Sequence, residues 1–212
     1  MFCTSMRFYK KHGYWPNIRQ PKTFNEKIQY RKFFQKHVLF QTCSDKYAVR
    51  EYVTKLAENS GEKRNEPWYS QIQPKVLVEQ LLVAQDGKLP EDYKFHVFNS
   101  LGGQKFFLQV DYDRQTKHSR CIYDELGQVT DISLSKPSNQ QPLPQIKNYT
   151  KMVELALKLA EPFDYVRVDL YNLDGHIYFG ELTFAHGSGF RKFTPQKYDK
   201  EWGDLWELSA SF

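Results

Sequence analysis

Apolar residues near the N-terminus recur at the three- and four-residue spacing of helices. Over Lys22–Lys36, the string Thr23-Phe24-Asn25-Glu26 has the pattern of a capping box, in which a threonine begins a helix and a glutamate follows three residues later. We expect a helix there and a second one over Asp45–Leu56. The apolar faces of the two helices are Phe24, Ile28 and Phe34, extended by Phe33 and Leu39, in the first, and Val49, Tyr52, Val53 and Leu56 in the second.

Beyond a polar stretch at residues 57–66, the pattern changes to the alternation and short apolar runs that are typical of strands. Strands are predicted over Lys75–Leu82, Asp92–Asn99, Gln104–Tyr112, Arg120–Asp124, Gln128–Ser133, Asp164–Tyr171 and His176–Phe184. A Ser-Leu-Gly-Gly turn predicts a hairpin between the second and third of these strands. A Glu-Leu-Gly turn predicts a weaker hairpin between the fourth and fifth.

One long helix is predicted before the last two strands. Residues 135–147 are a polar, proline-containing connection, and Tyr149–Ala160 follows with Met152, Leu155, Ala156 and Leu159 on one face. The tail carries Trp202, Leu205 and Trp206 at the spacing of a packed helical turn. Helices followed by a mainly antiparallel sheet indicate an α+β fold. We divide it into an N-terminal helical region, residues 1–66, and a core, residues 67–212.

The composition excludes several classes of protein. The chain has 212 residues, of which 40% are hydrophobic, a globular value. No apolar run approaches the roughly 18 residues of a membrane helix, and the first residues lack the apolar region of a signal peptide. Three widely spaced cysteines fit a reducing compartment, so we expect a cytoplasmic protein. The net charge of +5 comes without a dense basic run, and we expect no nucleic-acid partner.

The last predicted hairpin carries charged residues on strands that are otherwise apolar. In the string DYVRVDLY, Arg167, Asp169 and Tyr171 point to one face. A three-residue loop, Leu173–Gly175, with glycine in the left-handed position, would pair Arg167 with Glu181. Asp169 would then lie diagonal to Glu181, about 7–8 Å away. A two-residue loop would instead put the two carboxylates on opposite faces and remove the site.

Two carboxylates at that separation suit a magnesium ion. Mg²⁺ takes oxygen ligands, commonly one or two carboxylates together with substrate phosphates and water. Arg167, beside them, can bind an anion through two parallel hydrogen bonds. A second interpretation stays open on the residues alone, in which Arg167 and Glu181 form a cross-strand ion pair and Asp169 is merely solvated.

Several strings follow one another in order over nearly the whole chain: PKTFNEKI, CSDKYAVREYV, VLVEQLL, EDYKFHVFN and FDYVRVDLYNLDGHIYFGELTFAHGSGF. Together they resemble the TupA-like (teichuronopeptide-biosynthesis type) ATP-grasp family. Such proteins are usually associated with cell-surface polysaccharide biosynthesis and are often labelled glycosyltransferases. The resemblance implies ATP and Mg²⁺ as cofactors, a nucleotide held between two α+β subdomains, and phosphorylation of a carboxylate to an acyl phosphate that an amine attacks.

The resemblance also implies roles for individual residues. Asp169 and Glu181 resemble the two acidic Mg²⁺ ligands of the family. Arg167 resembles the arginine that steadies the transferred phosphoryl group, where developing charge needs a fixed cation, and Lys94 is assigned to catalysis with it. The remaining positions are the hinge Val78–Leu82, whose Glu79 and Leu82 would bind adenine, Asp92 for the ribose, Lys46 for a phosphate, and the small-residue turn Gly187–Gly189.

The chain departs from the family's pattern at two places. The usual third metal ligand is an asparagine two residues after the glutamate; here that position is Thr183, which is normal for the resembled subfamily. In addition, only Ala57–Gln73 joins the CSDKYAVREYV helix to the VLVEQLL strand. The family has several dozen residues there, including a strand lysine and a glycine-rich loop that surround the phosphates with cations and backbone N–H groups.

Simpler interpretations remain open for most of these residues. Glu79 could be an edge-strand charge, Lys46 and Arg50 a solvated helix face, Lys94 a surface lysine, and Gly187–Gly189 a flexible turn. No partner at catalytic spacing is apparent for three histidines, and we interpret them as structural: His96, His176 and His186.

Three functions follow, in decreasing order of support. The first is an ATP-grasp ligase that joins a carboxylate to an amine, with a uronic acid or an amino-acid-bearing polysaccharide as the expected carrier of the carboxylate. The second is a degenerate homologue that keeps the hinge and the metal hairpin and acts as a binding or partner protein. The third is a glycosyltransferase that uses a metal and a nucleotide sugar. It is ranked last because the Arg-Val-Asp strand does not resemble the metal motif of that class.

Overall fold

The structure, a computed structural model, describes residues 2–46, 48–50, 52–53, 82–83, 89–113 and 117–208. The helices are α1 (Phe2–His12), α2 (Phe24–Phe33), α3 (Val38–Cys43), α5 (Tyr149–Ala160), α6 (Lys197–Asp204) and the 3₁₀ turn η2 (His186–Gly189). The strands are β1 (Asp92–Ser100), β2 (Gly103–Tyr112), β3 (Ser119–Tyr123), β4 (Ser133–Leu134), β5 (Tyr165–Leu173), β6 (His176–Thr183) and β7 (Phe193–Thr194).

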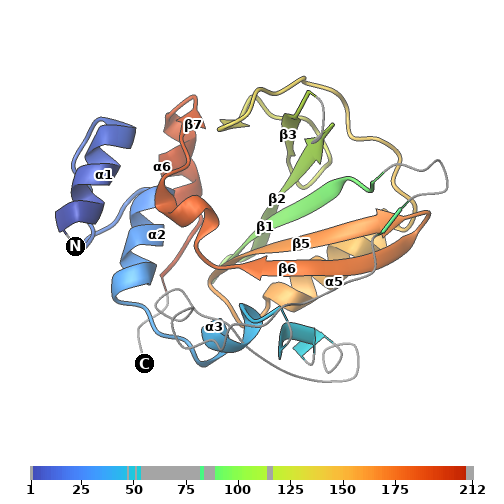
Figure 1. Cartoon of the computed structure of the whole chain (residues 1–212), viewed down its shortest axis with the longest axis horizontal. Coiled ribbons are helices and arrows are strands. Elements are labelled where there is room, and N and C mark those ends of the chain that lie inside the picture. The colour runs from blue at the N-terminus through green and yellow to red at the C-terminus, as the bar shows by residue number, and fades with distance from the viewer. Residues whose placement is uncertain are drawn as a thin grey trace.

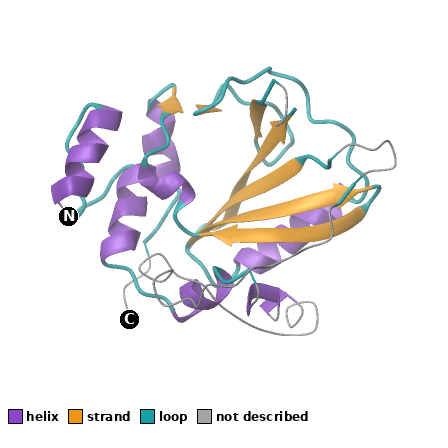
Figure 2. Cartoon of the chain, in the orientation of Figure 1, coloured by secondary structure: helices purple, strands orange, loops and turns teal. Residues whose placement is uncertain are grey.

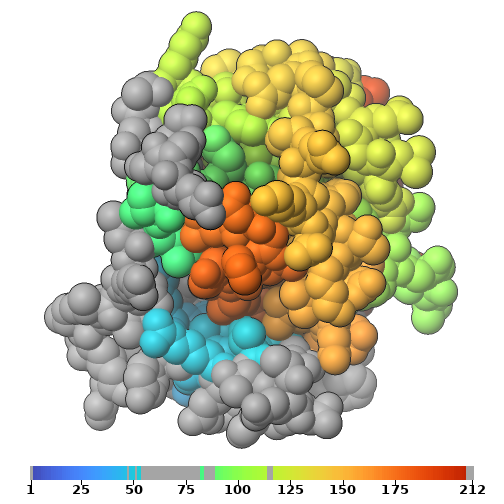
Figure 3. All heavy atoms as spheres, turned by 90° about the vertical axis from the view of Figure 1, so that its right-hand side faces the viewer, coloured from blue at the N-terminus to red at the C-terminus, as the bar shows by residue number. Residues whose placement is uncertain are grey.

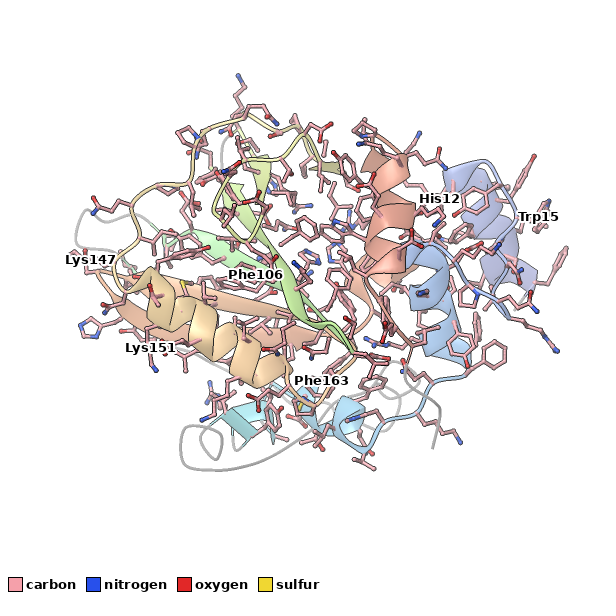
Figure 4. The ribbon with its side chains drawn as sticks, turned by 180° about the vertical axis from the view of Figure 1, so that it is seen from behind. His12, Trp15, Phe106, Lys147, Lys151 and Phe163 are labelled. Carbon is pink, nitrogen blue, oxygen red and sulfur yellow. The ribbon has the colours of Figure 1, made fainter. Side chains whose placement is uncertain are left out.

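A five-stranded sheet in the order β3-β2-β1-β5-β6 forms the centre of the molecule (Figure 1). All neighbouring strands in it are antiparallel. Figure 2 shows that α1, α2 and α6 gather beside one end of the sheet, whereas α5 runs along it. From behind, α5, marked by Lys151, covers one face (Figure 4). Helices around an antiparallel sheet confirm the expected α+β class.

The two faces of the sheet differ because side chains alternate along each strand. The face under α5 is apolar and packs with that helix and α3 into the larger core, which includes Phe95, Leu108 and Val168. The other face is divided. Next to α2 and α6 it is aromatic, with Phe98 and Tyr165 in a second core. Farther along the same strands it becomes charged, and this charged part carries the candidate site.

The predicted capping box of α2 is confirmed. The Thr23 hydroxyl accepts a hydrogen bond from the Glu26 backbone N–H, and the Glu26 carboxylate accepts one from the Thr23 backbone N–H. Phe24 and Ile28 are fully buried as expected, but Phe33 is exposed, because α2 ends there. The described residues of the second predicted helix, 48–50 and 52–53, are helical.

Most strand predictions are confirmed, with one correction. β1 and β2 form the hairpin that the Ser-Leu-Gly-Gly turn predicted, and α5 has the predicted bounds. The second strand of the weaker hairpin, Gln128–Ser133, is wrong. The chain does turn back after β3, but only a single bridge, Tyr123 to Val129, forms there, and β4 pairs with β7 instead. Of the predicted strand Lys75–Leu82, all but Leu82 lies outside the described residues, as does the boundary at residues 66 and 67.

Helix α6 packs closely on the start of α2. A Cβ atom at Gly203 would lie 2.3 Å from the carbonyl oxygen of Lys22, so only glycine allows this approach. The predicted aromatic pair of the tail, Trp202 and Trp206, is fully buried in the second core. Within the part of the chain that the structure describes, no helix has the length and apolar character that crossing a membrane requires.

Candidate functional site

The hairpin β5–β6 turns through two residues rather than three. Leu173 pairs with His176, and the two residues between them, Asp174 and Gly175, both have positive φ, 54° and 95°. Positive φ at both central positions is the requirement of a type I′ turn, whose twist matches that of the flanking strands. The predicted three-residue loop is therefore wrong, and on its own this turn would place Glu181 opposite Val168, on the apolar face.

A β-bulge at Gly180 shifts the register again and so reverses the face to which Glu181 points. Leu170 pairs with Phe179, but Asp169 pairs with Glu181, so Gly180 is an extra residue on β6. A Cβ atom at this glycine would lie 3.0 Å from the carbonyl oxygen of Asp169, which explains the residue type. Since the register shifts by one residue, Glu181 returns to the polar face. It lies directly opposite Asp169, not diagonal to it as predicted.

Arg167 joins the two carboxylates. Its Nε and Nη2 donate to the two oxygens of Asp169 at 2.6 and 2.7 Å, and Nη2 also donates to Glu181 Oε1 at 2.7 Å. The third nitrogen, Nη1, lies 2.7 Å from His186 Nδ1. The ion-pair interpretation from the sequence is thus met in part, and the metal-ligand interpretation stays a prediction. The cross-strand ion pair exists, but Asp169 is buried and held by Arg167 rather than solvated.

Lys94 on β1 is the second cation of the site. It lies opposite Asp169 in the sheet register, and its Nζ is 3.5 Å from Asp169 Oδ2. The same nitrogen is 2.7 Å from Asp92 Oδ1 and 3.8 Å from Asp111 Oδ2. The lysine is buried, so the alternative of a surface residue is wrong. Three carboxylates from three strands therefore converge on one ammonium group.

Asp111 also contacts Arg120 on β3, the strand at the edge of the sheet. Arg120 donates to both of its oxygens, at 2.5 and 3.1 Å. Burial raises the pKa of Asp111, but the hydrogen bonds and charge of Arg120, together with the charge of Lys94, bring it down to about 2. This carboxylate therefore remains ionised at all physiological pH values. It acts as a fixed negative anchor for Lys94.

Two buried histidines lie behind Arg167. Because Arg167 donates to His186 Nδ1, that ring carries its proton on Nε2, which has no hydrogen-bond partner among the described atoms. Burial, and next the charge of Arg167, hold the pKa of His186 well below its ordinary value, so the ring is neutral. His96 is likewise neutral because burial lowers its pKa. The contact of His186 with Arg167 has no local signature in the sequence, since the two residues meet only after β6 has folded back on β5.

The pKa of Asp169 is subject to opposing effects from its surroundings. Burial raises its pKa, Arg167 and Lys94 lower it, and the negative charge of Glu181 adds to the rise; the net direction is upward. Removing either cation would leave this buried carboxylate with less compensation, which favours its neutral form. The charge state of Asp169 thus depends on the cations around it.

A cleft of about 570 Å³ opens over these residues. Seven of the nine predicted site residues line it: Lys46, Leu82, Asp92, Lys94, Arg167, Asp169 and Glu181. Figure 3 looks onto this side of the molecule, where the end of the β5–β6 hairpin, in orange, lies between the cyan segment near residue 50 and the green segment near residue 90. Residues from four separate stretches of sequence therefore meet at one surface.

The other two predicted residues have different outcomes. Thr183 does not line the cleft, but its hydroxyl donates to Glu181 Oε1 at 3.0 Å, so it lies beside the predicted metal ligand. Glu79 lies outside the described residues, as does the linker Ala57–Gln73. The cleft is also lined by residues of the hairpin that were not predicted as site residues: Tyr171, Tyr178, Phe179 and Gly180.

The carboxylate oxygens of Asp169 and Glu181 suit a Mg²⁺ ion whose remaining ligands come from the substrate and water. Asp169 Oδ2 and Glu181 Oε1 share one nitrogen of Arg167 at 2.7 Å each, so the two oxygens are less than twice that distance apart. Carboxylate oxygens are hard donors of the kind that Mg²⁺ takes. Among the described residues no group of three or more His, Cys, Asp or Glu side chains could hold a metal. Phosphate oxygens and water would have to fill the remaining positions, as is usual for Mg²⁺.

Comparisons with known proteins identify the family of the chain. Searches of curated proteins and of solved structures found no match. A family model described as TupA-like ATP-grasp matches residues 41–207, which covers most of the chain, including every strand of the sheet and all the predicted site residues. The match establishes the resemblance that the sequence strings suggested. The chain therefore belongs to the TupA-like ATP-grasp family.

Proposed function

We propose that this protein is an ATP- and Mg²⁺-dependent ligase that joins a carboxylate to an amine through an acyl phosphate. Membership of the ATP-grasp family supports nucleotide binding with Mg²⁺. The observation that carries the proposal is the cleft itself, in which Lys46, Asp92 and Lys94 face the hairpin of Asp169 and Glu181. A phosphate chain needs both elements at once, namely cations for its oxygens and carboxylates for its metal ion.

Each cleft residue has a part in the proposed reaction. Asp169 and Glu181 would hold Mg²⁺, with the Thr183 hydroxyl beside them. Lys46 would bind a phosphate and Asp92 the ribose, while Leu82, with Glu79, would contact the adenine. Bound Mg²⁺ would offset the negative charge of the phosphates. These assignments follow the family, and five of the residues line the cleft: Lys46, Leu82, Asp92, Asp169 and Glu181.

Arg167 has the most specific role. Its guanidinium has three nitrogens within hydrogen-bond distance of partners, two of which are the proposed metal ligands. In the reaction a substrate carboxylate oxygen would attack the γ-phosphorus of ATP, and the bond to the bridging oxygen would break to release ADP. The amine would then attack the acyl carbon, phosphate would leave, and the amine would lose a proton. Arg167 would stabilise the charge on the transferred group in both steps.

The biological setting proposed here rests on the family alone. Members of the TupA-like type are associated with cell-surface polysaccharide biosynthesis, so the carboxylate would belong to a saccharide or to an amino acid attached to one. ATP is available in the cytoplasm, where we place the reaction.

A second candidate is a homologue with impaired catalysis that binds a ligand or a partner. The observation that favours it is that Arg167 already occupies oxygens of both Asp169 and Glu181. A metal ion has to compete with this arginine for its ligands. The short linker Ala57–Gln73 also offers few groups for the phosphates.

Two measurements distinguish the candidates. Calorimetry with Mg·ATP on the wild-type chain and on Asp169→Ala tests the site, with Glu154→Gln on the exposed face of α5 as a control for the loss of one carboxylate. Binding at a hundred-fold excess over Kd stabilises the fold by roughly 2.7 kcal/mol, which a thermal shift detects. We expect binding by the wild type and by the control and none by Asp169→Ala. Equal binding by all three proteins contradicts the metal assignment, and no binding by the wild type contradicts the ligase.

Activity is tested by incubating the protein with ATP, Mg²⁺ and a panel of carboxylates in the presence of hydroxylamine. Hydroxylamine is a strong nucleophile that converts an acyl phosphate to a hydroxamate, which is detected by colour with iron. A hydroxamate together with ADP supports the ligase. Nucleotide binding without either product supports the impaired homologue.

A further inference from the structure

Helix α1 presents an apolar stripe to solvent. Phe2, Met6 and Tyr9 recur at the i, i+4 and i+7 spacing that places side chains on one side of a helix. Trp15 stacks on Tyr9 with ring centroids 5.0 Å apart and on Phe2 with centroids 6.5 Å apart. The exposed fractions of these four residues lie between 39% and 69%. Together they form one apolar surface, which we call the α1 patch.

The other side of α1 is buried, which fixes the direction of the α1 patch. Phe8 is fully buried, and its ring centroid lies 4.3 Å from that of His12 and 5.3 Å from that of Tyr14. The Tyr14 hydroxyl is 3.1 Å from the Thr23 hydroxyl at the start of α2. Figure 4 shows Trp15 at the outer edge of the molecule. The buried side of α1 therefore faces the rest of the molecule, and the α1 patch faces outward.

Cations border the α1 patch. Lys10 follows Met6 by four residues, so it lies next to the apolar stripe, and Arg7 and Lys11 continue on the side beyond it. The helix contains no aspartate or glutamate. In the described ranges of the chain, none of these three cations takes part in an ion pair. An apolar stripe with uncompensated cations beside it is typical of a helix that lies in a membrane interface.

An anionic lipid surface matches both parts of this pattern. Tryptophan and tyrosine rings favour the level of the lipid headgroups, where an apolar ring meets water. Lysine and arginine keep their methylene stems among apolar groups while their charged ends reach the phosphates. Basic residues next to a membrane are attracted by the negative surface potential of anionic lipids. Charge complementarity therefore favours a bilayer with anionic lipid over one with neutral headgroups alone.

The size of the α1 patch argues against a second copy of the chain, or another stable protein partner, as its occupant. An aromatic side chain has about 150–250 Å² to bury, so three such side chains and Met6, each roughly half exposed, offer about 400 Å². One partner in a standard protein interface contributes about 800 Å². A bilayer sets no such requirement, because a helix needs only to place its apolar side chains at the boundary of the acyl chains.

Docking through α1 would leave the candidate site open to water. Figure 1 places α1 at one end of the molecule. Figure 3 looks onto the other end, where the cleft over Asp169 opens. A ligand in solution could thus reach that cleft while α1 lies on a membrane surface.

We propose that α1 is a peripheral membrane anchor. The α1 patch enters the headgroup region of a bilayer that contains anionic phospholipid, and Arg7, Lys10 and Lys11 bind the lipid phosphates. The attachment is reversible, because only a few side chains enter the interface and no segment spans the bilayer. This activity goes beyond the proposed ligase and does not depend on nucleotide.

The test is co-sedimentation of the full chain with sucrose-loaded vesicles in the absence of nucleotide. Vesicles of phosphatidylcholine mixed with phosphatidylglycerol are compared with vesicles of phosphatidylcholine alone. Each cation near an anionic surface contributes about fivefold to binding, so we expect the wild type to bind the anionic vesicles at least about tenfold more strongly. Binding should weaken as NaCl is added, because salt screens the attraction.

The apolar contribution is tested with Phe2→Ser/Trp15→Ser, which removes two exposed rings of the α1 patch. Its matched control, Leu101→Ser/Leu126→Ser, removes two leucines that are 99% and 81% exposed in turns elsewhere. We expect affinity for the anionic vesicles to fall by about tenfold or more in the first variant and to stay within about twofold in the control. Trp15→Ser alone should weaken binding in the same direction if the double variant does not fold.

The charged contribution is tested with Arg7→Gln/Lys10→Gln. Lys136→Gln/Lys151→Gln, at two exposed lysines far from α1 in the sequence, is the control for the loss of two positive charges. At about fivefold per cation, the first variant should lose about tenfold or more in affinity, whereas the control should resemble the wild type.

Three results would overturn the proposal: no binding of the wild type to anionic vesicles, equal binding to both kinds of vesicle, or wild-type binding by either α1 variant. A dimer in sedimentation velocity that Phe2→Ser/Trp15→Ser abolishes, without binding to vesicles, would also overturn it and assign the α1 patch to a second copy. The assay contains no nucleotide, so failure of the anchor leaves the ligase standing. Failure of Mg·ATP binding in calorimetry likewise leaves the anchor standing.

Discussion

Asp169 lies directly opposite Glu181 in the β5–β6 hairpin, although the two-residue turn of that hairpin alone would place them on opposite faces. The extra residue, Gly180, corrects the register by one position. The candidate metal site therefore depends on a bulge as much as on its two carboxylates, and this relationship gives the first prediction.

Gly180→Ala should weaken the site. The new Cβ would lie 3.0 Å from the Asp169 carbonyl oxygen and 3.2 Å from the Tyr171 ring, so the backbone around Asp169 has to move. We expect a loss of about 1–3 kcal/mol in the free energy of unfolding, typical of overpacking, together with weaker Mg·ATP binding. Urea titration and calorimetry measure the two effects. Gly102→Ala in the β1–β2 turn, where the nearest atom is 3.6 Å away, is the matched control and should retain nucleotide binding.

Arg167→Met should create a site for Mg²⁺ in the absence of nucleotide. In the wild type Arg167 occupies oxygens of both Asp169 and Glu181. Its loss breaks a buried ion pair and leaves Asp169 with the longer contact to Lys94, at a cost of about 3–5 kcal/mol. A divalent cation can take the place of the guanidinium. Thermal unfolding with increasing MgCl₂, at ionic strength matched with NaCl, should raise the Tm of the variant more than that of the wild type. The same shift in both proteins would show that Arg167 and the metal do not compete.

Arg31 and Asp164 should show strong coupling in a double-mutant cycle. Arg31 is fully buried, pairs with Asp164, and donates to the carbonyl oxygens of Tyr165 and Phe184 at 2.7 and 3.0 Å. Either single change, Arg31→Met or Asp164→Leu, leaves a buried charge or unpaired groups, so the double variant should lose less stability than the sum of the single losses. We expect a coupling energy of at least about 1 kcal/mol by urea unfolding.

The exposed pair Lys200–Asp204 in α6 provides the comparison for that cycle. Its partners are both more than half exposed, and the expected coupling is below about 0.5 kcal/mol. A coupling at Arg31 as small as this would mean that its carbonyl contacts, rather than the ion pair, hold α2 to the sheet.

Stability should fall in mild acid because of His96. This ring is completely buried between Tyr165 and Gln109, and burial lowers its pKa well below 6.5. The unfolded chain then binds a proton that the folded chain does not. The contribution of His96 is therefore fully present above about pH 6.5 and is lost as pH falls below it, by up to about 1.4 kcal/mol per pH unit.

The test compares the wild type with His96→Gln by urea unfolding between pH 7.5 and 4.5. A comparison is needed because Asp199 acts in the opposite direction. Burial raises its pKa to about 6, so its contribution is present at low pH and is lost as pH rises through 6. The variant should show the smaller loss of stability in acid. Parallel pH curves for the two proteins would contradict the assignment to His96.

Local patterns in the sequence were sufficient for most elements of the fold. The capping box at Thr23 and the periodicity of Tyr149–Ala160 depend on residues close together in the chain, and both elements form with the expected bounds or nearly so. The second strand after β3 was predicted wrongly, because its turn signal is met by a single bridge while Ser133 and Leu134 find a better partner in β7. Pairing between distant segments has no local signature.

The candidate site was predictable in its residue types but not in its register. Alternation on β5 was enough to place Arg167 and Asp169 on one face. The bulge was not predictable, because it depends on how closely Gly180 approaches the backbone of the neighbouring strand. The convergence of three carboxylates on Lys94 was also beyond local reasoning, since it requires that β1 lie between β2 and β5. The burial of Arg31 is a further case, because its partners Asp164, Tyr165 and Phe184 lie more than 130 residues away in the chain.

The second core has a consequence for shorter fragments of this protein. The family match begins at residue 41, whereas Phe24, Ile28 and Arg31 come before it and fill the space between the sheet and α6. A fragment trimmed to the matched residues would expose Trp202 and Trp206 to water. It would also remove Arg31, which donates to the carbonyl oxygens of Tyr165 and Phe184. Helix α2 and the sheet should therefore melt in one cooperative transition, and fragments that begin at residue 41 should aggregate rather than fold.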